Sequence, residues 1–348
     1  MNRYCLILSL SLINYCLAYY TYSTIDSTLH AWQDDYGQDV HPLLGDYGII
    51  YNLDTIGFSS QDNLPIFAVK LSSDANFPKQ DKPRVLILGQ CHAEEIYGVE
   101  ISMGIIECYL NPQQCWNDFE KIRPYLLNIL ENSLEKIELW VVPTHNPEGL
   151  RVVHGYCDED ISVTEGTCNG NWIEDPTYRK NIRDAVNFDT FDYVEGVGQD
   201  KDGVDLNRNY DVNWIFGDEL LEQTNSCNNN YNDDYDYYRG SAPFSEKEIL
   251  AVRNLAIEKK FLLSIAYHSS RSGCVAEKVV FPWGWKDQGN SDNQRKISPD
   301  YSIIKYLGDK LHQILEFPSA DFAVPQGSRT GNAHDWLYRE TGDRKSVV

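Results

Sequence analysis

Apolar positions along the chain follow two alternating patterns, short runs typical of strands and longer segments with helical spacing. Residues 83–90 form a continuous apolar run, as in a strand buried on both faces, whereas residues 64–71 alternate as in a half-buried strand. The pattern predicts strands at 64–71, 83–90, 136–149, 261–270 and 278–284, and helices at 22–37, 94–110, 116–133, 244–260 and 301–315. Strands that alternate with helices predict an α/β sheet covered on both faces.

Local signals mark the start of two of these helices. Ser23 and Thr24 stand before the first apolar positions of the helix at 22–37. Ser245 and Glu248 have the spacing of a capping box, in which each side chain satisfies a backbone N–H group at the helix start.

Two long polar stretches, at residues 158–204 and 225–240, interrupt the predicted elements without dividing the chain. They are rich in Gly, Asp and Asn, and no Pro/Ser/Gly tract separates two halves of the sequence. We therefore expect one domain, over residues 19–342.

The first 18 residues have the features of a secretory signal peptide. Arg3 supplies a positive end, the apolar run from Leu6 to Leu17 is too short to span a bilayer, and Ala18 offers a small residue for cleavage. The alternative is a buried N-terminal helix. We expect a secreted, extracytoplasmic protein without a membrane span after signal removal, because no other apolar run is long enough.

Net charge narrows the classes of partner. The 348-residue chain has an ordinary globular composition, 42% hydrophobic and 24% charged, but its formal net charge is −22. Such an acidic surface repels phosphate backbones, which argues against a nucleic acid partner. We expect a soluble monomer in which a functional arginine stands out from its surroundings.

The cysteine count fits an exported protein. The chain has nine cysteines, of which Cys5 and Cys16 belong to the signal segment. The remaining seven are Cys91, Cys108, Cys115, Cys157, Cys168, Cys227 and Cys274. Export permits disulfides, and Cys108/Cys115 and Cys157/Cys168 are close enough for local loops. An odd count leaves at least one thiol free or paired elsewhere, and the absence of a CxxC pair argues against a cysteine zinc site.

Three histidines follow predicted strands, where ligand sites of α/β sheets gather. They are His92, His145 and His268. His92 and Glu95 are three residues apart, so one helical turn would put both on one face, and a third ligand would complete a His₂Glu zinc site. The second such pair, His145 and Glu148, includes Pro147 and Gly149, which predict a turn. No H-E-x-x-H motif occurs. The residues alone leave the metal and structural interpretations of His92 and Glu95 evenly balanced.

Two further segments carry candidate ligand-binding groups. Asn207 and Arg208 have the chemistry of a carboxylate clamp, because the planar guanidinium fork matches a carboxylate. The alternative is a surface ion pair between Asp205 and Arg208. Asp200, Asp202 and Asp205 could supply oxygens to Ca²⁺, but their spacing fits no complete EF-hand, and a solvated acidic loop is the simpler interpretation.

The order of the motifs carries more information than any one of them. The chain contains HAEE at 92–95, THNPEG at 144–149, YRK at 178–180, VDLNRNY at 204–210, YRGSAPFSEKE at 238–248, AYHSS at 266–270 and HDWLY at 334–338. In this order they resemble the zinc metallocarboxypeptidases, the family of carboxypeptidases A and B. The resemblance implies a mixed eight-stranded sheet between helices and hydrolysis of the C-terminal peptide bond of peptides and proteins by a zinc-activated water.

The resemblance also implies a role for each matching residue. His92, Glu95 and His268 would bind one Zn²⁺, and Arg179 would polarise the scissile carbonyl and stabilise the oxyanion. Asn207 and Arg208 would hold the terminal carboxylate of the substrate, and Tyr338 would close over it. His145 becomes part of a structural turn.

The end of the chain departs from the family pattern. The general base of the family is a glutamate on a strand one loop beyond the tyrosine, and Glu340 is too close to Tyr338 to match it. We expect that the C-terminal part of the domain is missing and that residues 343–348 are a non-native tail. Two alternatives remain, a peptide-binding pseudoenzyme without the base and a related zinc amidase acting on cell-wall peptides. The intact Asn207 and Arg208 pair favours a free carboxylate terminus over the amidase substrate.

Overall fold

The computed structural model describes residues 19–77, 81–113, 115, 123–155, 175–184, 198–216, 235–269, 278–282, 284–286, 295–316, 319–322 and 331–341. The predicted signal peptide (1–18) and the predicted tail (343–348) lie outside these residues, so both remain predictions. Within the described part of the chain, no helix has both the length and the apolar character needed to cross a bilayer.

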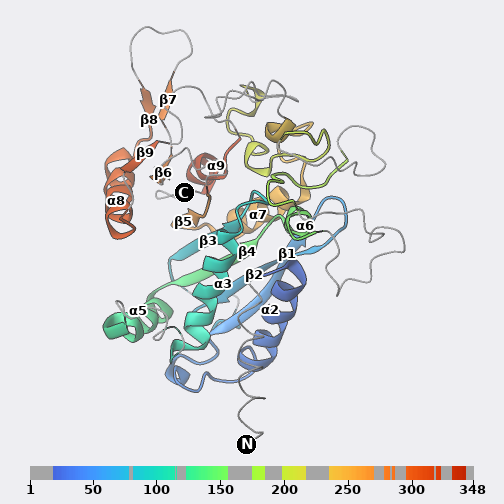
Figure 1. Ribbon diagram of the computed structural model, residues 1–348. Helices are drawn as coiled ribbons and strands as arrows, with labels where there is room; N and C mark the ends of the chain where they lie inside the picture. Colours follow the sequence, from blue (N-terminus) through green and yellow to red (C-terminus); the bar gives the residue numbers. More distant parts are fainter. Residues whose placement is uncertain are drawn as a thin grey trace, which may run out of the picture.

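A five-stranded mixed sheet forms the centre of the protein (Figure 1). The strands are β1 (Tyr51–Phe58), β2 (Pro65–Leu71), β3 (Arg84–Gln90), β4 (Glu138–Thr144) and β5 (Leu263–Ala266), in the spatial order β1-β2-β4-β3-β5. β3 pairs in parallel with both β4 and β5, whereas β1 and β2 run antiparallel to their neighbours. The carboxyl ends of the three parallel strands therefore meet at one edge of the sheet. The predicted mixed α/β architecture is confirmed.

The expected number of eight strands is not reached in one sheet of the described residues. The predicted strand at 278–284 gives β6 (Lys278–Phe281), which pairs with β9 (Ser319–Phe322) instead of with the central sheet. β7 (Gly284–Lys286) and β8 (Arg295–Ile297) form another separate pair. β1 was not predicted, because its side chains are half-exposed at a sheet edge and do not alternate cleanly.

Helices cover both faces of the sheet (Figure 1). One core packs the sheet against α2 (Tyr22–Tyr36), α3 (Tyr97–Leu110) and α5 (Arg123–Lys136), and the other packs it against α7 (Lys247–Lys259) and α9 (Ala333–Thr341). α8 (Tyr301–Ile314) packs on β6 and β9, and the short α6 (Pro147–Val153) follows β4. Four short 3₁₀ turns complete the described elements: η1 (Gly45–Tyr47), η2 (Leu206–Arg208), η3 (Trp214–Phe216) and η4 (Tyr235–Tyr237).

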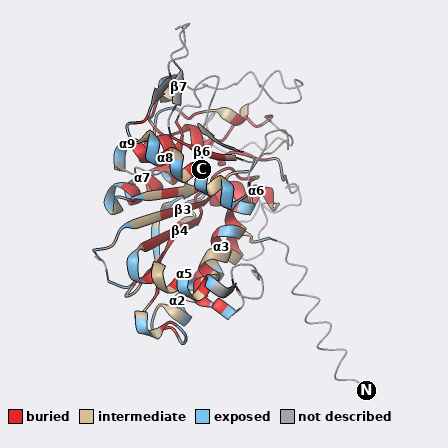
Figure 2. Ribbon diagram, turned by 90° about the vertical axis from the view of Figure 1, so that its left-hand side faces the viewer, coloured by how far each residue is buried: buried red, intermediate tan, exposed pale blue. Residues whose placement is uncertain are grey.

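Successive residues of the central strands enter opposite cores, as the pleat requires. Ile87 belongs to the core under α2, α3 and α5, whereas its neighbours Leu86 and Leu88 belong to the core under α7 and α9. Figure 2 shows the consequence, with buried residues along β3 and β4 and exposed residues on the outer sides of the helices. The continuous apolar run of β3 is thus explained by burial on both faces.

Two local structures that the sequence predicts are replaced by others in the folded protein. α7 begins at Lys247, and the predicted capping box does not form: Ser245 donates to Glu246 Oε1 (2.7 Å) and the Glu248 carboxylate accepts from Ser60 N (3.0 Å). The predicted turn after β4 is the start of α6, whose first turn is capped by the Asn146 side chain. By contrast, the first helix is capped close to the predicted place, by the pair Thr21 and Thr24.

The predicted local disulfide between Cys108 and Cys115 is present. Cys91 is a buried free thiol, which fits the expectation of an unpaired cysteine. The other predicted pair, Cys157 and Cys168, lies outside the described residues.

Three fully buried glutamates, Glu148, Glu246 and Glu248, join four parts of the chain near the sheet edge. The Asn181 side chain donates to Glu246 Oε2 (2.8 Å) and to Glu248 Oε1 (3.2 Å), and Arg183 donates to Glu246 Oε1 (2.7 Å). Carboxylates buried close together resist simultaneous ionisation. Burial and the neighbouring Glu248 raise the pKa of Glu148 to about 8, and burial and Glu246 raise the pKa of Glu248 to about 7.

These raised pKa values predict a pH-dependent stability. The unfolded chain releases such protons near pH 4.3 and the folded chain only near pH 7 to 8, so the free energy of unfolding should fall as pH rises between these values. Glu148→Gln cannot ionise, and its amide oxygen can still accept from Gln61 N (2.8 Å) and Asp62 N (2.6 Å). We expect it to reduce the slope by up to ~1.4 kcal/mol per pH unit, the value for one proton, in urea unfolding between pH 5 and 8.

Glu258 of α7 provides the control, because its side chain is exposed. Glu258→Gln should keep the wild-type dependence of the free energy of unfolding on pH. An unchanged slope in Glu148→Gln would show that Glu148 does not take up a proton on folding.

Candidate metal centre

The turn between β3 and α3 presents His92 and Glu95. Glu95 N donates to His92 O (3.1 Å), and α3 begins only at Tyr97 and not at residue 94 as predicted, so both residues lie in a turn before the helix. The turn is tight because Gly89 and Gly98 let the strand end and the helix start touch. A Cβ on Gly98 would lie 2.5 Å from Gly89 O, so a larger residue could not stand there without moving the backbone.

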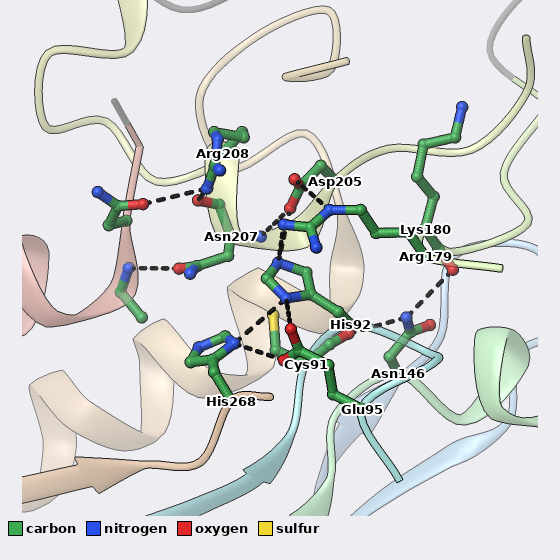
Figure 3. Close-up of polar contacts among 12 residues, drawn as sticks. Cys91, His92, Glu95, Asn146, Arg179, Lys180, Asp205, Asn207, Arg208 and His268 are labelled. Carbon is green, nitrogen blue, oxygen red and sulfur yellow. Dashed lines mark hydrogen bonds and ion pairs between the residues drawn. The ribbon is translucent and has the colours of Figure 1, made fainter. Parts of the chain in front are cut away.

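His268 completes a three-residue cluster with His92 and Glu95. His268 follows β5, which lies beside β3, and its Nδ1 is 2.7 Å from Glu95 Oε2 and 3.2 Å from His92 Nδ1. His92 Nδ1 is 3.1 Å from Glu95 Oε1. Figure 3 shows the three side chains pointing toward one another. In the described part of the chain, this is the only group of three or more His, Cys, Asp or Glu side chains placed to hold a metal ion.

The donor set fits a transition metal. Two imidazole nitrogens and one carboxylate oxygen, all within 4.8 Å of one another, match the ligands that zinc takes in catalytic sites. The structure thus brings together the three residues predicted as metal ligands.

Asp205 holds the opposite edge of the His92 ring. Its Oδ1 lies 3.1 Å from His92 Nε2, so a proton on Nε2 leaves Nδ1 as the nitrogen that faces Glu95 and His268 (Figure 3). Carboxylates in this position orient a ligating histidine and make it a stronger donor. Asp205 is fully buried, which rules out the surface ion pair considered for Asp205 and Arg208. The sequence did not identify this role, because Asp205 is far from His92 along the chain.

Charges in the cluster shift the pKa of each member. Burial and Arg179 oppose protonation of His92, but Glu95 and Asp205 outweigh them and raise its pKa. Burial lowers the pKa of His268. Burial opposes the ionisation of Glu95 and Asp205, yet the positive groups around them lower the pKa of both carboxyls. Both carboxylates are therefore ionised at neutral pH and offer negative charge to a cation.

Arg179 lies beside Nε2 of the same ring and binds two acids. Its Nε donates to Asp205 Oδ2 (3.0 Å), its Nη1 lies 3.3 Å from Glu94 Oε1, and its Nη2 is 2.8 Å from His92 Nε2. One ring nitrogen cannot both donate to Asp205 and accept from Arg179. When His92 Nδ1 binds a metal, the proton resides on Nε2, and the Nη2 group of Arg179 is then available to a ligand.

Asn146 connects the segment that carries Arg179 to the turn that carries His92 and Glu95. Its Nδ2 donates to Cys91 O (2.9 Å) and to Lys180 O (3.1 Å), and Ala93 N donates to Arg179 O (2.9 Å). The N-P-E-G segment, expected to be only a structural turn, therefore fixes Arg179 relative to His92.

Asn207 and Arg208 lie in η2, directly after Asp205. Both are buried, and Arg208 Nη1 donates to Asn207 O (2.7 Å) and to Asn332 Oδ1 (3.2 Å). Asn207 Oδ1 accepts from Ala333 N (2.9 Å), at the start of α9. In the described residues, the hydrogen bonds of the Arg208 guanidinium all use Nη1, which leaves its other edge for a ligand.

Tyr338 is packed among other residues. It belongs to a small core with Phe281 and Ile304, and its hydroxyl donates to Asp300 Oδ2 (3.3 Å). Its role as a tyrosine that closes over the substrate remains a prediction.

His145 and Cys91 are near the cluster but do not join it. Burial, together with the charges of His268 and His92, lowers the pKa of His145 to about 3, so it is neutral. Neither of its ring nitrogens has a hydrogen-bond partner among the described residues. Burial raises the pKa of the Cys91 thiol, which therefore stays protonated.

The acidic segment 200–205 is not a solvated loop, because Asp200, Asp202 and Asp205 are all buried. Asp205 serves His92 and Arg179, and the buried Lys180 donates to Asp200 O (2.7 Å). Burial lowers the pKa of Lys180 to about 8, against the attraction of nearby aspartates. The Lys180 side chain supplies positive charge next to these aspartates. Among the described residues, no group of side chains around this segment is placed to hold a calcium ion.

Comparison with known proteins connects this cluster to one family. A family model described as zinc carboxypeptidase matches residues 39–347. Mast cell carboxypeptidase A of Rattus norvegicus is 28% identical over 290 residues, which are 81% of this chain and 54% of the relative. Carboxypeptidase B of Astacus astacus is 22% identical, over 90% of this chain and 81% of the relative. The chain thus spans about half the length of the mast cell relative that it matches.

Solved structures support the fold. Carboxypeptidase A from Helicoverpa armigera superposes with a TM-score of 0.62 at 17% identity, over 94% of this chain and 63% of that chain. Thrombin activatable fibrinolysis inhibitor gives a TM-score of 0.61 at 19% identity, over 94% of this chain and 65% of that chain. At these identities the similarity shows a shared fold.

The contact between Asp205 and His92 predicts that this aspartate strengthens metal binding. Asp205→Asn keeps the shape of the side chain but removes its charge, and we expect the affinity for Co²⁺, used as a spectroscopic probe, to fall about 10- to 100-fold. Titration followed by the visible absorption of bound Co²⁺ measures this affinity.

Asp335→Asn is the matched control, because Asp335 is also a buried aspartate and burial raises its pKa to about 8. It should bind Co²⁺ like the wild type. Equal affinity in Asp205→Asn would mean that Asp205 does not orient the ligand His92.

Proposed function

Because the chain belongs to the zinc carboxypeptidase family, we propose that it is a zinc-dependent carboxypeptidase that removes the C-terminal residue of peptides and proteins. The observation that carries the proposal is the convergence of His92, Glu95 and His268 with a guanidinium group, Arg179, on one edge of the sheet. A cation site next to a buried arginine suits reactions in which negative charge develops on a carbonyl oxygen.

The three clustered side chains would hold one Zn²⁺, which when bound supplies Lewis acidity and lowers the pKa of a coordinated water. His92 and His268 would act as neutral ligands through Nδ1, and Asp205 would hold the proton on His92 Nε2. The charges of Glu95 and Asp205 favour a dication in an otherwise buried place.

Arg179 would bind the carbonyl oxygen of the scissile bond. Asp205 fixes its Nε, so the guanidinium enters the reaction already oriented. Burial opposes the charge of Arg179, but Asp205 and Glu94 outweigh burial and raise its pKa well above the usual value. A group that is oriented in advance does not lose free energy by reorganising as the oxyanion forms.

Asn207 and Arg208 would recognise the terminal carboxylate, which makes the enzyme an exopeptidase. A buried arginine with a free edge can pair with a carboxylate through two parallel hydrogen bonds. The side-chain amide of Asn207 extends the same surface. We propose that the substrate is a peptide with a free C-terminus and that the enzyme acts outside the cytoplasm, as the signal-like first 18 residues suggest.

The clamp predicts a specific kinetic defect. Arg208→Gln should raise KM about 100-fold for peptides with a free C-terminus, since the lost charge-assisted pair is worth ~3 kcal/mol. Peptides with a C-terminal amide should be poor substrates of both proteins. Rates of residue release from a peptide panel, measured with the zinc-loaded product of the full-length gene, check this prediction.

Arg253→Gln, on the outer side of α7, should leave KM unchanged. A wild-type protein that binds one zinc and the peptides but releases no residue would fit the peptide-binding homologue instead. Failure to bind zinc would contradict the proposed function at its first step.

A further inference from the structure

A tyrosine outside the predicted motifs contacts both functional arginines. The Tyr237 ring centroid lies 5.1 Å from Cζ of Arg179 and 5.6 Å from Cζ of Arg208. Both distances are within the roughly 6 Å over which a cation is attracted to the face of an aromatic ring. Tyr237 is half-buried, so these contacts are partly shielded from water.

The backbone on both sides of Tyr237 is anchored to the site. Before it, Tyr235 N donates to Gly198 O (3.1 Å) and the Asp236 carboxylate accepts from Gly198 N (3.1 Å). After it, Tyr238 O accepts from Asp205 N (2.8 Å). These hydrogen bonds fix the backbone of Tyr237, and with it the ring, relative to the segment that carries Asp205 and η2.

The hydrogen bonds of the two arginines run to different partners. Arg179 is bound by Asp205 and Glu94 on one side of the site, and Arg208 by Asn207 O and Asn332 on the other. Two guanidinium cations also repel each other. Among the described residues, the Tyr237 ring is the one aromatic ring within cation–π distance of both.

We propose that Tyr237 is a positioning residue whose ring fixes the spacing of Arg179 and Arg208. This inference rests on the proposed function, in which Arg179 binds the scissile carbonyl and Arg208 the terminal carboxylate. The covalent structure of a C-terminal residue fixes the distance between those two substrate groups, so the two guanidinium groups must keep a matching distance. A ring that both cations share meets this need without adding a charge.

The ring, and not the hydroxyl, carries this role. Phenylalanine offers a similar face to a cation, whereas leucine fills space without the negative face of an aromatic ring. Tyr237→Phe should thus keep most of the wild-type behaviour, and Tyr237→Leu should lose it. Tyr235→Leu is the matched control, since Tyr235 is in the same turn but its ring faces Lys201.

The experiment uses zinc-loaded full chains and two readouts. The first is binding of N-acetylphenylalanine, compared with N-acetylphenylalaninamide, by calorimetry, which needs no turnover and reports on the carboxylate site. The second is kcat and KM for the peptide that the wild type cleaves fastest. Thermal unfolding and zinc content of each variant establish that it is folded and loaded.

Tyr237→Leu should bind the carboxylate probe about tenfold more weakly and should lower kcat as well as raise KM, because both arginines lose their shared partner. Tyr237→Phe should remain within a few-fold of wild type, and Tyr235→Leu should match it. A residue with only a structural role would lower the unfolding temperature without this joint change in kcat and KM.

Three results would overturn the inference. One is a folded, zinc-loaded Tyr237→Leu with wild-type probe affinity and kinetics. Another is a Tyr237→Phe as defective as Tyr237→Leu, which would assign the effect to the hydroxyl. The third is a wild-type protein that neither discriminates the carboxylate probe from its amide nor cleaves peptides. Only this last result would also remove the proposed function, so the two failures can be told apart.

Discussion

One buried carboxylate organises this site. Asp205 binds His92 through one oxygen and Arg179 through the other. Its Oδ1 also accepts from Asn207 N (2.9 Å), which caps the turn that begins with Leu206. An ionised carboxylate without solvent must be compensated by close positive or N–H groups, and here these partners are the functional groups themselves. The position of the metal ligand, the orientation of the arginine and the start of η2 therefore depend on a single negative charge. Without that charge, His92 and Arg179 would face each other with no acceptor between them.

The sheet explains why distant residues can share this carboxylate. Three parallel strands end at one edge, so the residues that follow β3 and β5 meet although they are far apart in sequence. Apolar runs predicted these strands, because β3 and β4 are largely buried on both faces and β5 is buried at alternate residues. The strand ends predicted where the ligands His92 and His268 lie. The motif order, through the family resemblance, pointed to the same residues.

The parts that the sequence did not predict depend on contacts across the chain. Nothing local indicates that Asp205 contacts His92, that Asn146 supports Arg179, or that Tyr237 touches two arginines. The capping box at Ser245 was a reasonable local interpretation, but Glu248 found stronger partners in Ser60 and Asn181. The sheet of eight strands was expected from the family resemblance, and in the described residues β6 pairs with β9 outside the five-stranded central sheet. Local propensity yields to tertiary partners at these places.

The start of α9 has a consequence for how the protein responds to a ligand. Asn332 and Ala333 supply contacts to Arg208 and Asn207, so the surface that would hold a carboxylate is partly built by a helix from the far end of the chain. Docking of α9 and occupation of that surface are then linked equilibria, and each must favour the other by the same free energy. A ligand bound there would stabilise the docked position of α9 and so lower the rate at which the amide hydrogens of α9 exchange with solvent.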